Sequence, residues 1–425
     1  MKLYKGNILF TKQSDRFEVI PNGYIAVENG CVTAVYDHLP DELRAAELVD
    51  FGDKLIIPAM NDLHVHAPQY RNMGMAMDME LLPWLNTYTF PEESKYADTA
   101  YARKMYSRFV KHLWKVGTMR TVAFASIHKP ATELLLDMFD KSGMGAMVGK
   151  VNMNRNSPDT LTETVEQAIA DDTALIERWG DKQRLVQFIL TPRFVPSCTP
   201  EMLTAVGRLA AKYGAPVQSH LSENKGEIAW VKELEPESTC YGDAYNRYGL
   251  FGQTPTLMAH CCYTDGEELA LMKRQGVVVV HCPHSNSDLG SGKAPIRKFL
   301  QNGICVALGS DISGGHDISM FRVMVHAIQI SKLYYAESDK QTPFLTLPEA
   351  FYLATKSGGS FFGRVGSFEP GYEFDALVID DTALNFDNYT LVERLERFIY
   401  TGDDRQIAAR YVRGNEVPEP KFDEA

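Results

Sequence analysis

The amino-acid sequence predicts an α/β protein, with a (β/α)8 barrel of the TIM type and a small β-sandwich domain built from both termini. Eight short apolar runs in the middle of the chain each precede a helix-like segment, and this alternation is typical of parallel βα units. Both ends of the chain instead contain short β-rich segments separated by Gly, Asn and Asp. A length of 425 residues leaves room for a barrel of about 250 residues and an attached domain.

The predicted small domain is discontinuous and comprises residues 1–57 and 366–425. Valine, isoleucine and aromatic residues favour strands, and runs of them bounded by turn residues indicate where each strand lies. Five such segments occur in the two parts of this domain, at residues 7–10, 23–27, 31–35, 374–380 and 408–412.

The predicted catalytic barrel comprises residues 58–365. Its eight strand-like runs begin just before its N-terminal boundary and lie at residues 54–66, 118–125, 146–153, 185–191, 216–220, 256–260, 276–281 and 304–309. Helical patterns separate the runs, as in residues 101–116, where Met105, Phe109 and Leu113 recur at helical spacing. The same alternation also permits a doubly wound open sheet, so both architectures stay open at this point.

Composition and charge exclude several classes of function. Lys and Arg number 43 against 55 Asp and Glu, and the net charge of −12 argues against nucleic acid or an anionic membrane as the main partner. Seven cysteines without a Cys-x-x-Cys motif are typical of a reducing compartment. The N-terminus has no signal-peptide pattern, and no apolar run approaches the ~18 residues of a membrane span. We therefore expect a cytoplasmic protein.

Two histidines close the first apolar run of the predicted barrel. His64 and His66 are two residues apart, so in a strand they project from the same face. Two imidazoles at the carboxyl end of a strand form half of a metal site. Taken alone, this pair is also compatible with a chance arrangement.

Three later runs also end in potential metal ligands, namely His220, His260 and Asp311. The carboxyl ends of all strands in a parallel barrel meet on one face, so these three side chains should converge with His64 and His66. The alternative is that five such residues follow apolar strands by accident. Imidazoles with one carboxylate suit Zn²⁺, or Fe²⁺, and a metal site of this kind keeps an open position for water. The metal lowers the pKa of that water towards neutrality.

An acidic residue, Glu223, lies three positions after His220. A carboxyl group on the loop above a metal can pass a proton from an attacking water to the substrate and to a leaving group. The alternative is a solvated loop residue or a glutamate near a helix N-terminus.

These motifs and the stretches around them resemble the amidohydrolase superfamily and, within it, the guanine deaminase family. The resemblance covers nearly the whole chain, and the metal motifs are those of the superfamily. Residues 84–92 and the pair Arg193-Phe194 resemble guanine deaminases more narrowly. The segments that carry the resemblance are residues 64–70, 82–92, 149–153, 191–194, 219–224, 259–263 and 309–315.

The resemblance implies a role for each matching residue. It implies that one zinc ion is held by His64, His66, His220 and Asp311, with Glu223 as the proton shuttle and His260 as a hydrogen-bond partner of the attacking hydroxide or the tetrahedral intermediate. It further implies that the purine is bound by Gln69, Trp84, Arg193 and Phe194. Arg offers a fixed fork of donors to a carbonyl, Gln offers both donor and acceptor, and Phe offers a stacking face. Without the resemblance, a surface ion pair for Arg193 and core packing for Phe194 would be preferred.

The resemblance also implies the reaction. Guanine would be hydrolysed at ring carbon 2 to xanthine and ammonia, a step of purine catabolism, by a homodimer. Pro58-Ala59 and Asp62-Leu63-His64 depart from the usual family motifs without removing a ligand, and His284 has no assigned role. Two alternatives remain: a deaminase of another amino-heterocycle such as a pterin, triazine, adenine or cytosine derivative, and a barrel that serves only as an interaction scaffold.

Overall fold

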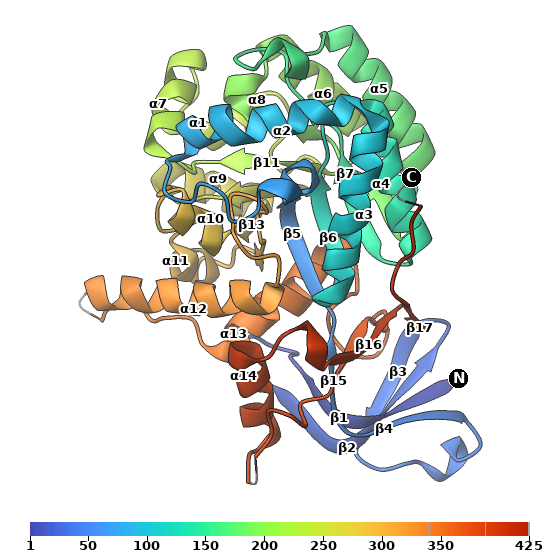
Figure 1. The fold of residues 1–425 in the computed structure, drawn as a ribbon. Coiled ribbons are helices and arrows are strands. Elements are labelled where there is room, and N and C mark those ends of the chain that lie inside the picture. Colours follow the sequence, from blue (N-terminus) through green and yellow to red (C-terminus); the bar gives the residue numbers. More distant parts are fainter. Residues whose placement is uncertain (339, 387, 424–425) are drawn as a thin grey trace.

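The computed structural model describes residues 1–338, 340–386 and 388–423, and a seven-stranded sheet forms one end of the molecule (Figure 1). The strand order is β17-β16-β15-β4-β1-β2-β3, so both ends of the chain meet in one sheet. Its strands are β1 (Lys2–Phe10), β2 (Glu18–Glu28), β3 (Cys31–Tyr36), β4 (Glu47–Pro58), β15 (Ala376–Ile379), β16 (Ile407–Val412) and β17 (Asn415–Glu416).

Parallel strands form the centre of the rest of the molecule, and each of the eight predicted runs overlaps at least one of them. The first run divides in two, because residues 54–58 belong to β4 of the terminal sheet. Two four-stranded sheets have the orders β5-β6-β7-β9 and β11-β12-β13-β14, and β8 pairs with β10. Their strands are β5 (Met60–His66), β6 (Thr118–Phe124), β7 (Gly145–Gly149), β8 (Val151–Asn152), β9 (Val186–Phe188), β10 (Thr191–Pro192), β11 (Val217–Leu221), β12 (Thr256–His260), β13 (Val278–His281) and β14 (Val306–Leu308).

Backbone hydrogen bonds connect the two four-stranded sheets on both sides. The Asp311 N–H donates to the His64 carbonyl at 2.8 Å, and the His66 N–H donates to the Ile312 carbonyl at 2.8 Å. On the other side, the Gln218 N–H donates to the Leu190 carbonyl at 3.0 Å. The strands follow one another in sequence order, without the reversal that defines a doubly wound sheet.

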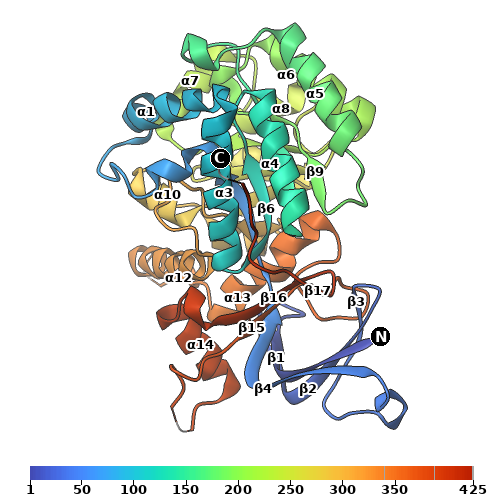
Figure 2. The same ribbon diagram turned by 45° about the vertical axis from the view of Figure 1, so that its right-hand side comes forward.

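Helices surround the parallel strands, and Figure 2 shows α3, α4 and α5 in succession on the outside. The predicted helix at 101–116 is confirmed as α3, which starts at the cap Asp98 and ends at Lys115. Within the described ranges, none of the helices combines the length and apolar character that crossing a membrane requires. The helices are α1 (Leu81–Trp84), α2 (Phe90–Glu93), α3 (Thr99–Lys115), α4 (Lys129–Ser142), α5 (Val165–Trp179), α6 (Pro200–Tyr213), α7 (Lys225–Leu234), α8 (Tyr241–Arg247), α9 (Gly266–Gln275), α10 (Pro283–Asp288), α11 (Ile296–Gln301), α12 (Met320–Glu337), α13 (Leu347–Tyr352) and α14 (Leu391–Thr401).

The core has two layers around the parallel strands. Large apolar side chains between strands and helices form the outer layer, and α3 contributes Phe109, Val110 and Leu113 to it. A smaller cluster takes one or more side chains from most of the strands: Leu63, Val122, Met147, Ile189, Leu257, Ala259, Val280, Cys282 and Ala307. Each fully buried Val, Leu or Phe stabilises the fold by about 1.5–3 kcal/mol, so the strand ends stand on a rigid support.

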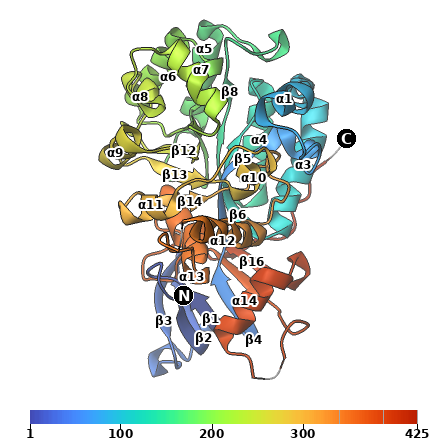
Figure 3. The same ribbon diagram turned by 90° about the vertical axis from the view of Figure 1, so that its left-hand side faces the viewer.

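The helix α14 was not among the predicted elements of the C-terminal part. Thr390 and Glu393 form a capping box at its start, and Leu395, Phe398 and Ile399 are buried. The motif Thr-x-x-Glu before apolar residues at helical spacing was the signal that identifies this helix from sequence. In Figure 3, α14 lies beside the terminal sheet, where it contacts β1 and β2.

A buried ion pair ties the terminal sheet to the parallel strands. Arg120 of β6 donates through Nε to Asp375 Oδ2 at 2.6 Å, and its guanidinium also contacts Glu373. The side chains of Arg120 and Asp375 are 2% and 1% exposed. Removing one partner of such a pair leaves an uncompensated charge in a region without water.

We expect Arg120→Met to destabilise the protein by about 3–5 kcal/mol, because Asp375 would stay buried without its partner. Thermal and urea unfolding measure the effect. Arg405→Met is the control, because Arg405 pairs with Asp403 at the surface and its loss should change the melting temperature far less. Equal losses of stability in the two variants would contradict the structural role of Arg120.

Candidate active site

The five strand-end residues meet at the carboxyl ends of the parallel strands, on the side away from the terminal sheet (Figure 1). His66 and His260 are the last residues of β5 and β12, and His220 is the last but one of β11. Asp311 follows β14 by three residues. The structure therefore brings these predicted residues together, although they are up to about 250 positions apart in the sequence.

The nitrogen and oxygen atoms of this group face one another. The Nε2 atoms of His66 and His220 are 3.1 Å apart. Asp311 Oδ1 lies 3.3 Å from His64 Nε2 and 3.4 Å from His66 Nε2. These are the four residues that the family resemblance implies as metal ligands.

The environment sets the protonation of this group. Burial lowers the pKa values of His64, His66 and His220, and neighbouring imidazoles lower those of His66 and His220 further. Burial opposes ionisation of Asp311, but the imidazoles of His64, His260 and His66 outweigh it and lower the pKa of the carboxyl group. Neutral imidazoles beside an ionised carboxylate are the forms that bind a divalent metal.

The donor set fits a metal ion. His64 Nε2 is buried and has no hydrogen-bond partner among the described residues. His220 Nδ1 bonds to the Arg193 carbonyl at 2.6 Å, which leaves Nε2 with its lone pair directed at the cluster. Two overlapping groups have all their ligand atoms within 4.8 Å of one another: His64, His66 and His220, and His64, His260, Cys282 and Asp311.

Cys282 belongs to the second group and was missed by the sequence analysis. It directly follows β13, so its position at a strand end was the available signal. Its thiol is buried and contacts the Val280 carbonyl at 3.6 Å. Thiolates bind zinc well, so the ligand set needs a direct test.

Glu223 and His260 form a second part of the site. Glu223 is buried, so the alternative of a solvated loop residue is wrong. Its Oε1 accepts from the Ser291 hydroxyl at 2.7 Å, and its Oε2 lies 3.5 Å from His260 Nε2. Burial raises the pKa of Glu223, which favours a carboxyl group that carries a proton. His260 Nε2 is also 3.7 Å from Asp311 Oδ2, and His260 Nδ1 bonds to Asn286 Oδ1 at 2.9 Å.

Two of these residues adopt left-handed backbone conformations. His260 has φ of 70° and Asp311 has φ of 50°. Such angles are uncommon outside glycine and cost on the order of 1 kcal/mol or more each. Backbone hydrogen bonds hold both turns: Gly315 N–H donates to the Asp311 carbonyl at 2.7 Å, and Cys261 N–H donates to the Leu221 carbonyl at 2.9 Å. The strained turns direct the side chains toward the shared centre.

The four residues expected to bind a purine line one cavity beside the metal ligands. The cavity has a volume of about 460 Å³, and Gln69, Trp84, Arg193 and Phe194 all contribute to its wall. Trp84 is buried and donates through Nε1 to the Met75 carbonyl at 3.3 Å. The same cavity is lined by His66, His220, Glu223, His260 and Asp311.

Arg193 is buried, so the alternative of a surface ion pair is wrong. Its Nη1 donates to Glu93 Oε2 at 2.6 Å, and its guanidinium lies 5.3 Å from the centre of the Phe90 ring. Phe194 is only partly buried and its ring faces the ring of Trp230 at 6.3 Å, so it is not a core residue. Glu93 was missed by the sequence analysis, because nothing in its local sequence distinguishes it from its neighbour Glu92.

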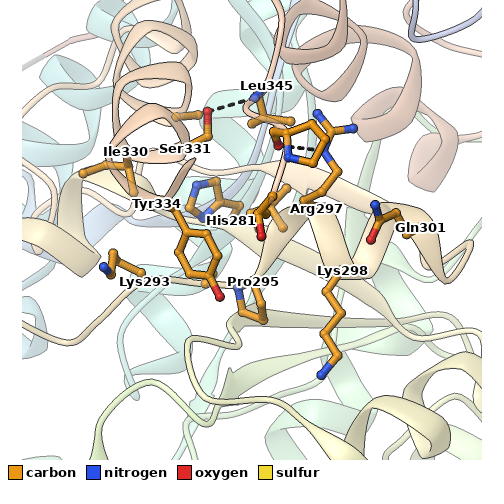
Figure 4. Close-up of a pocket in the computed structure, with 15 residues that line it drawn as sticks. His281, Lys293, Pro295, Arg297, Lys298, Gln301, Ile330, Ser331, Tyr334 and Leu345 are labelled. Atoms are coloured by element: carbon orange, nitrogen blue, oxygen red, sulfur yellow. Dashed lines mark hydrogen bonds between the residues drawn. The ribbon is translucent and has the colours of Figure 1, made fainter. Parts of the chain in front are cut away.

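A larger cavity of about 800 Å³ lies elsewhere, between α11, α12 and the segment that precedes α13 (Figure 4). Lys293, Arg297 and Lys298 line it together with Tyr334 and the buried His281, and among the described residues no carboxylate does. None of the predicted site residues borders this cavity, so size alone does not identify the active site.

His284 lies outside the active-site cavity. It is buried in α10, and its ring packs against those of His316 and His326, with centres 4.4 and 4.7 Å away. The structure therefore gives no support for a contact between His284 and a substrate.

Comparisons with known proteins identify the family of the chain. Residues 55–417 match the amidohydrolase family model. The guanine deaminase of Dictyostelium discoideum is 39% identical and covers 98% of both chains. That of Escherichia coli K12 is 37% identical over 90% of this chain and 86% of its own. A crystal structure of guanine deaminase from C. acetobutylicum, with guanine bound in its active site, is 55% identical, has a TM-score of 0.96 and covers 98% of this chain and 99% of its own.

A family match over residues 55–417 and relatives of 37–39% identity, covered to 86% or more of their own length, show the family of the chain. The chain therefore belongs to the amidohydrolase family, on the branch that contains the guanine deaminases.

Proposed function

We propose that the protein is a guanine deaminase that converts guanine and water to xanthine and ammonia. One observation carries the proposal: the cavity that holds the expected purine-binding residues is lined by the metal ligands and the acid–base residues as well. A flat heterocycle in this cavity would contact the expected purine-binding residues and the metal ligands and acid–base residues at the same time. The guanine deaminase relatives, one of them crystallised with guanine, support the choice of substrate.

The metal centre has a separate part in this proposal. We assign one Zn²⁺ to His64, His66, His220 and Asp311, and Fe²⁺ suits the same donors. A divalent cation bound there supplies Lewis-acid chemistry. The buried Nε2 of His64 makes no hydrogen bond among the described residues, although Asp311 Oδ1 lies 3.3 Å away. This supports the assignment, because a buried ligand atom without a hydrogen bond is otherwise costly.

The side chains of the chain account for the proton transfers. Arg193 and Gln69 hold the purine, Asp311 takes one proton from the attacking water, and Glu223 gives its proton to ring nitrogen 3 as the new bond to carbon 2 forms. The remaining hydroxyl proton then passes through Glu223 to the amino group, the bond from carbon 2 to that group breaks, and ammonia leaves. The proton held by Asp311 restores Glu223. His260 lies within 4 Å of both carboxylates and stabilises the charge that develops between them.

We also propose the finer architecture expected from sequence: a closed (β/α)8 barrel over residues 58–365 and a small β-sandwich domain from residues 1–57 and 366–425. The sequential strand order and the hydrogen bonds on both sides of the two parallel sheets support closure. The homodimer, the cytoplasmic location, and the absence of nucleic-acid and membrane partners stay predictions.

A screen of substrates tests the function directly. Purified protein incubated with purines, pterins, triazines and pyrimidines should release ammonia fastest from guanine and form xanthine in equal amount. A preference for another amino-heterocycle would favour the alternative deaminase. Zinc-free protein that is inert toward every amine would favour the scaffold.

Metal removal and ligand substitution test the metal assignment. A chelator should abolish ammonia release and zinc should restore it, with about one metal per chain in the active protein. His220→Ala should lose both metal and activity, whereas Cys282→Ser should keep both, because Cys282 is outside the assigned ligand set. Elemental analysis measures the metal, and zinc loss in Cys282→Ser would replace our ligand set with the other group.

Arg193→Lys tests the contact to the purine. A lysine keeps the charge opposite Glu93 but lacks the planar fork of donors, so kcat/KM for guanine should fall by about 100-fold, which corresponds to about 3 kcal/mol. Zinc content should stay unchanged, because only the backbone carbonyl of Arg193 touches a metal ligand. Arg44→Lys, at an exposed position, is the control. Normal guanine kinetics in Arg193→Lys would overturn the substrate assignment.

A further inference from the structure

Glu93 accepts hydrogen bonds from Gln69 and Arg193, the two polar residues among those expected to bind the purine. Gln69 and Arg193 line the active-site cavity, and Glu93 does not. We propose that Glu93 is the specificity-determining positioning residue of the enzyme, which holds Gln69 and Arg193 as a pair of donors and so selects purines with an oxo group at position 6. This inference rests on the proposed function and adds the residue that sets its selectivity.

The geometry of Glu93 uses both of its carboxylate oxygens. Oε1 accepts from Gln69 Nε2 at 2.8 Å, and Oε2 accepts from Arg193 Nη1 at 2.6 Å. Glu93 comes from α2, Gln69 from the turn after β5, and Arg193 from the residues after β10. One buried carboxylate thus connects three segments of the chain. Charge-assisted hydrogen bonds of this length strongly restrict the side chains they join.

Glu93 also sets the orientation of the Gln69 amide. The Gln69 NH₂ group faces the carboxylate, and its Oε1 accepts from the Ser313 N–H at 3.3 Å. A flipped amide would put an oxygen against the Glu93 carboxylate and an NH₂ group against a backbone N–H. Both contacts would be repulsive, so only one orientation is available. Gln69 therefore keeps its NH₂ group, which has one further N–H, at the same carboxylate that holds Arg193.

Arg193 depends on the same carboxylate. Its guanidinium is buried, and a buried charge is stable only when it is paired. Glu93 is the carboxylate with which it forms an ion pair within the described part of the chain. Glu93 does not hold the remaining N–H groups of the Arg193 guanidinium, and these groups can donate to a ligand in the cavity. The result is a cluster of donors on one side of the cavity, fixed before any substrate enters.

This arrangement distinguishes purines by the group at position 6. The oxygen of guanine at this position accepts hydrogen bonds and matches a cluster of donors. In 2,6-diaminopurine an amino group replaces that oxygen, while the leaving group at carbon 2 is the same. When donors of the protein face an amino group, which also donates, buried polar groups stay without hydrogen bonds. The free-energy cost of these lost hydrogen bonds strongly favours guanine over 2,6-diaminopurine. If Gln69 were free to flip, its carbonyl could accept from the amino group and the penalty would fall.

Glu93→Gln tests the proposal because it removes the charge and keeps the shape. We expect the ratio of kcat/KM for guanine to that for 2,6-diaminopurine to fall by about tenfold or more, as Gln69 gains its second orientation. Zinc content should not change. Ammonia release with each purine measures the ratio, and elemental analysis measures the metal.

Glu92→Gln is the matched control. Glu92 is equally buried on the same helix, but its carboxylate accepts from Lys95 at 2.6 Å, from Tyr101 and from Arg71 at 3.5 Å, and from no residue of the cavity. A general loosening of this segment would affect both variants, as thermal unfolding would show, whereas the substrate ratio should change only in Glu93→Gln. An unchanged ratio in Glu93→Gln, or an equal change in Glu92→Gln, would overturn the proposal.

A second variant covers the case in which Glu93→Gln does not fold. Glu93→Asp keeps the charge that compensates Arg193 but withdraws the carboxylate by one methylene, so it should also lower the ratio, to a smaller degree. An unchanged ratio in Glu93→Asp would count against the proposal. Failure of the wild-type protein to deaminate guanine would refute the proposed function itself, and that outcome is visible before any variant is measured.

Discussion

The active site depends on the contact between the first and the last of the parallel strands. Two backbone hydrogen bonds, each 2.8 Å long, join Asp311 and Ile312 to His64 and His66. The buried Asp62 strengthens this contact, because its Oδ1 accepts from the backbone N–H groups of Ser310 and of His64. The segments that carry three of the four assigned ligands are thereby held at fixed distances. Any change that separates these strands would separate the ligands too.

Burial gives this cluster its chemical character. In water, the imidazoles would exchange protons near neutral pH and the carboxylates would be ionised and hydrated. Inside the protein, burial lowers the pKa values of His64, His66 and His220, whereas the nearby imidazoles of His64, His260 and His66 outweigh burial and lower the pKa of Asp311. Glu223 lies only slightly farther away, and burial raises its pKa instead. Two carboxylates in one cavity therefore have opposite tendencies, as separate base and acid roles require.

The metal centre and the purine end are built by different parts of the fold. The assigned ligands lie on strands or, like Asp311, just after one, so their positions follow from the strand order. The residues at the purine end come from connecting segments, in particular residues 67–98, which contain α1 and α2. Connecting segments vary more easily than strands, so a common metal centre can serve different substrates. In this chain the buried Glu93 connects two of those segments through its hydrogen bonds to Gln69 and Arg193.

The sequence by itself predicted the parallel strands and the meeting of His64, His66, His220, His260 and Asp311 at their carboxyl ends. Apolar runs that alternate with helices identify the strands. Because the carboxyl ends of parallel strands lie on one face, the strand order alone predicts that the residues at those ends lie close together. The resemblance to a known family predicted which residues bind the purine, and the structure places these residues in one cavity wall. Only the tertiary structure decided that Cys282 lies beside the ligands, that Ser291 holds Glu223, and that Glu93 joins Gln69 to Arg193. These contacts are made between segments far apart in the chain, and their distances depend on how loops pack, which no local pattern of residues records.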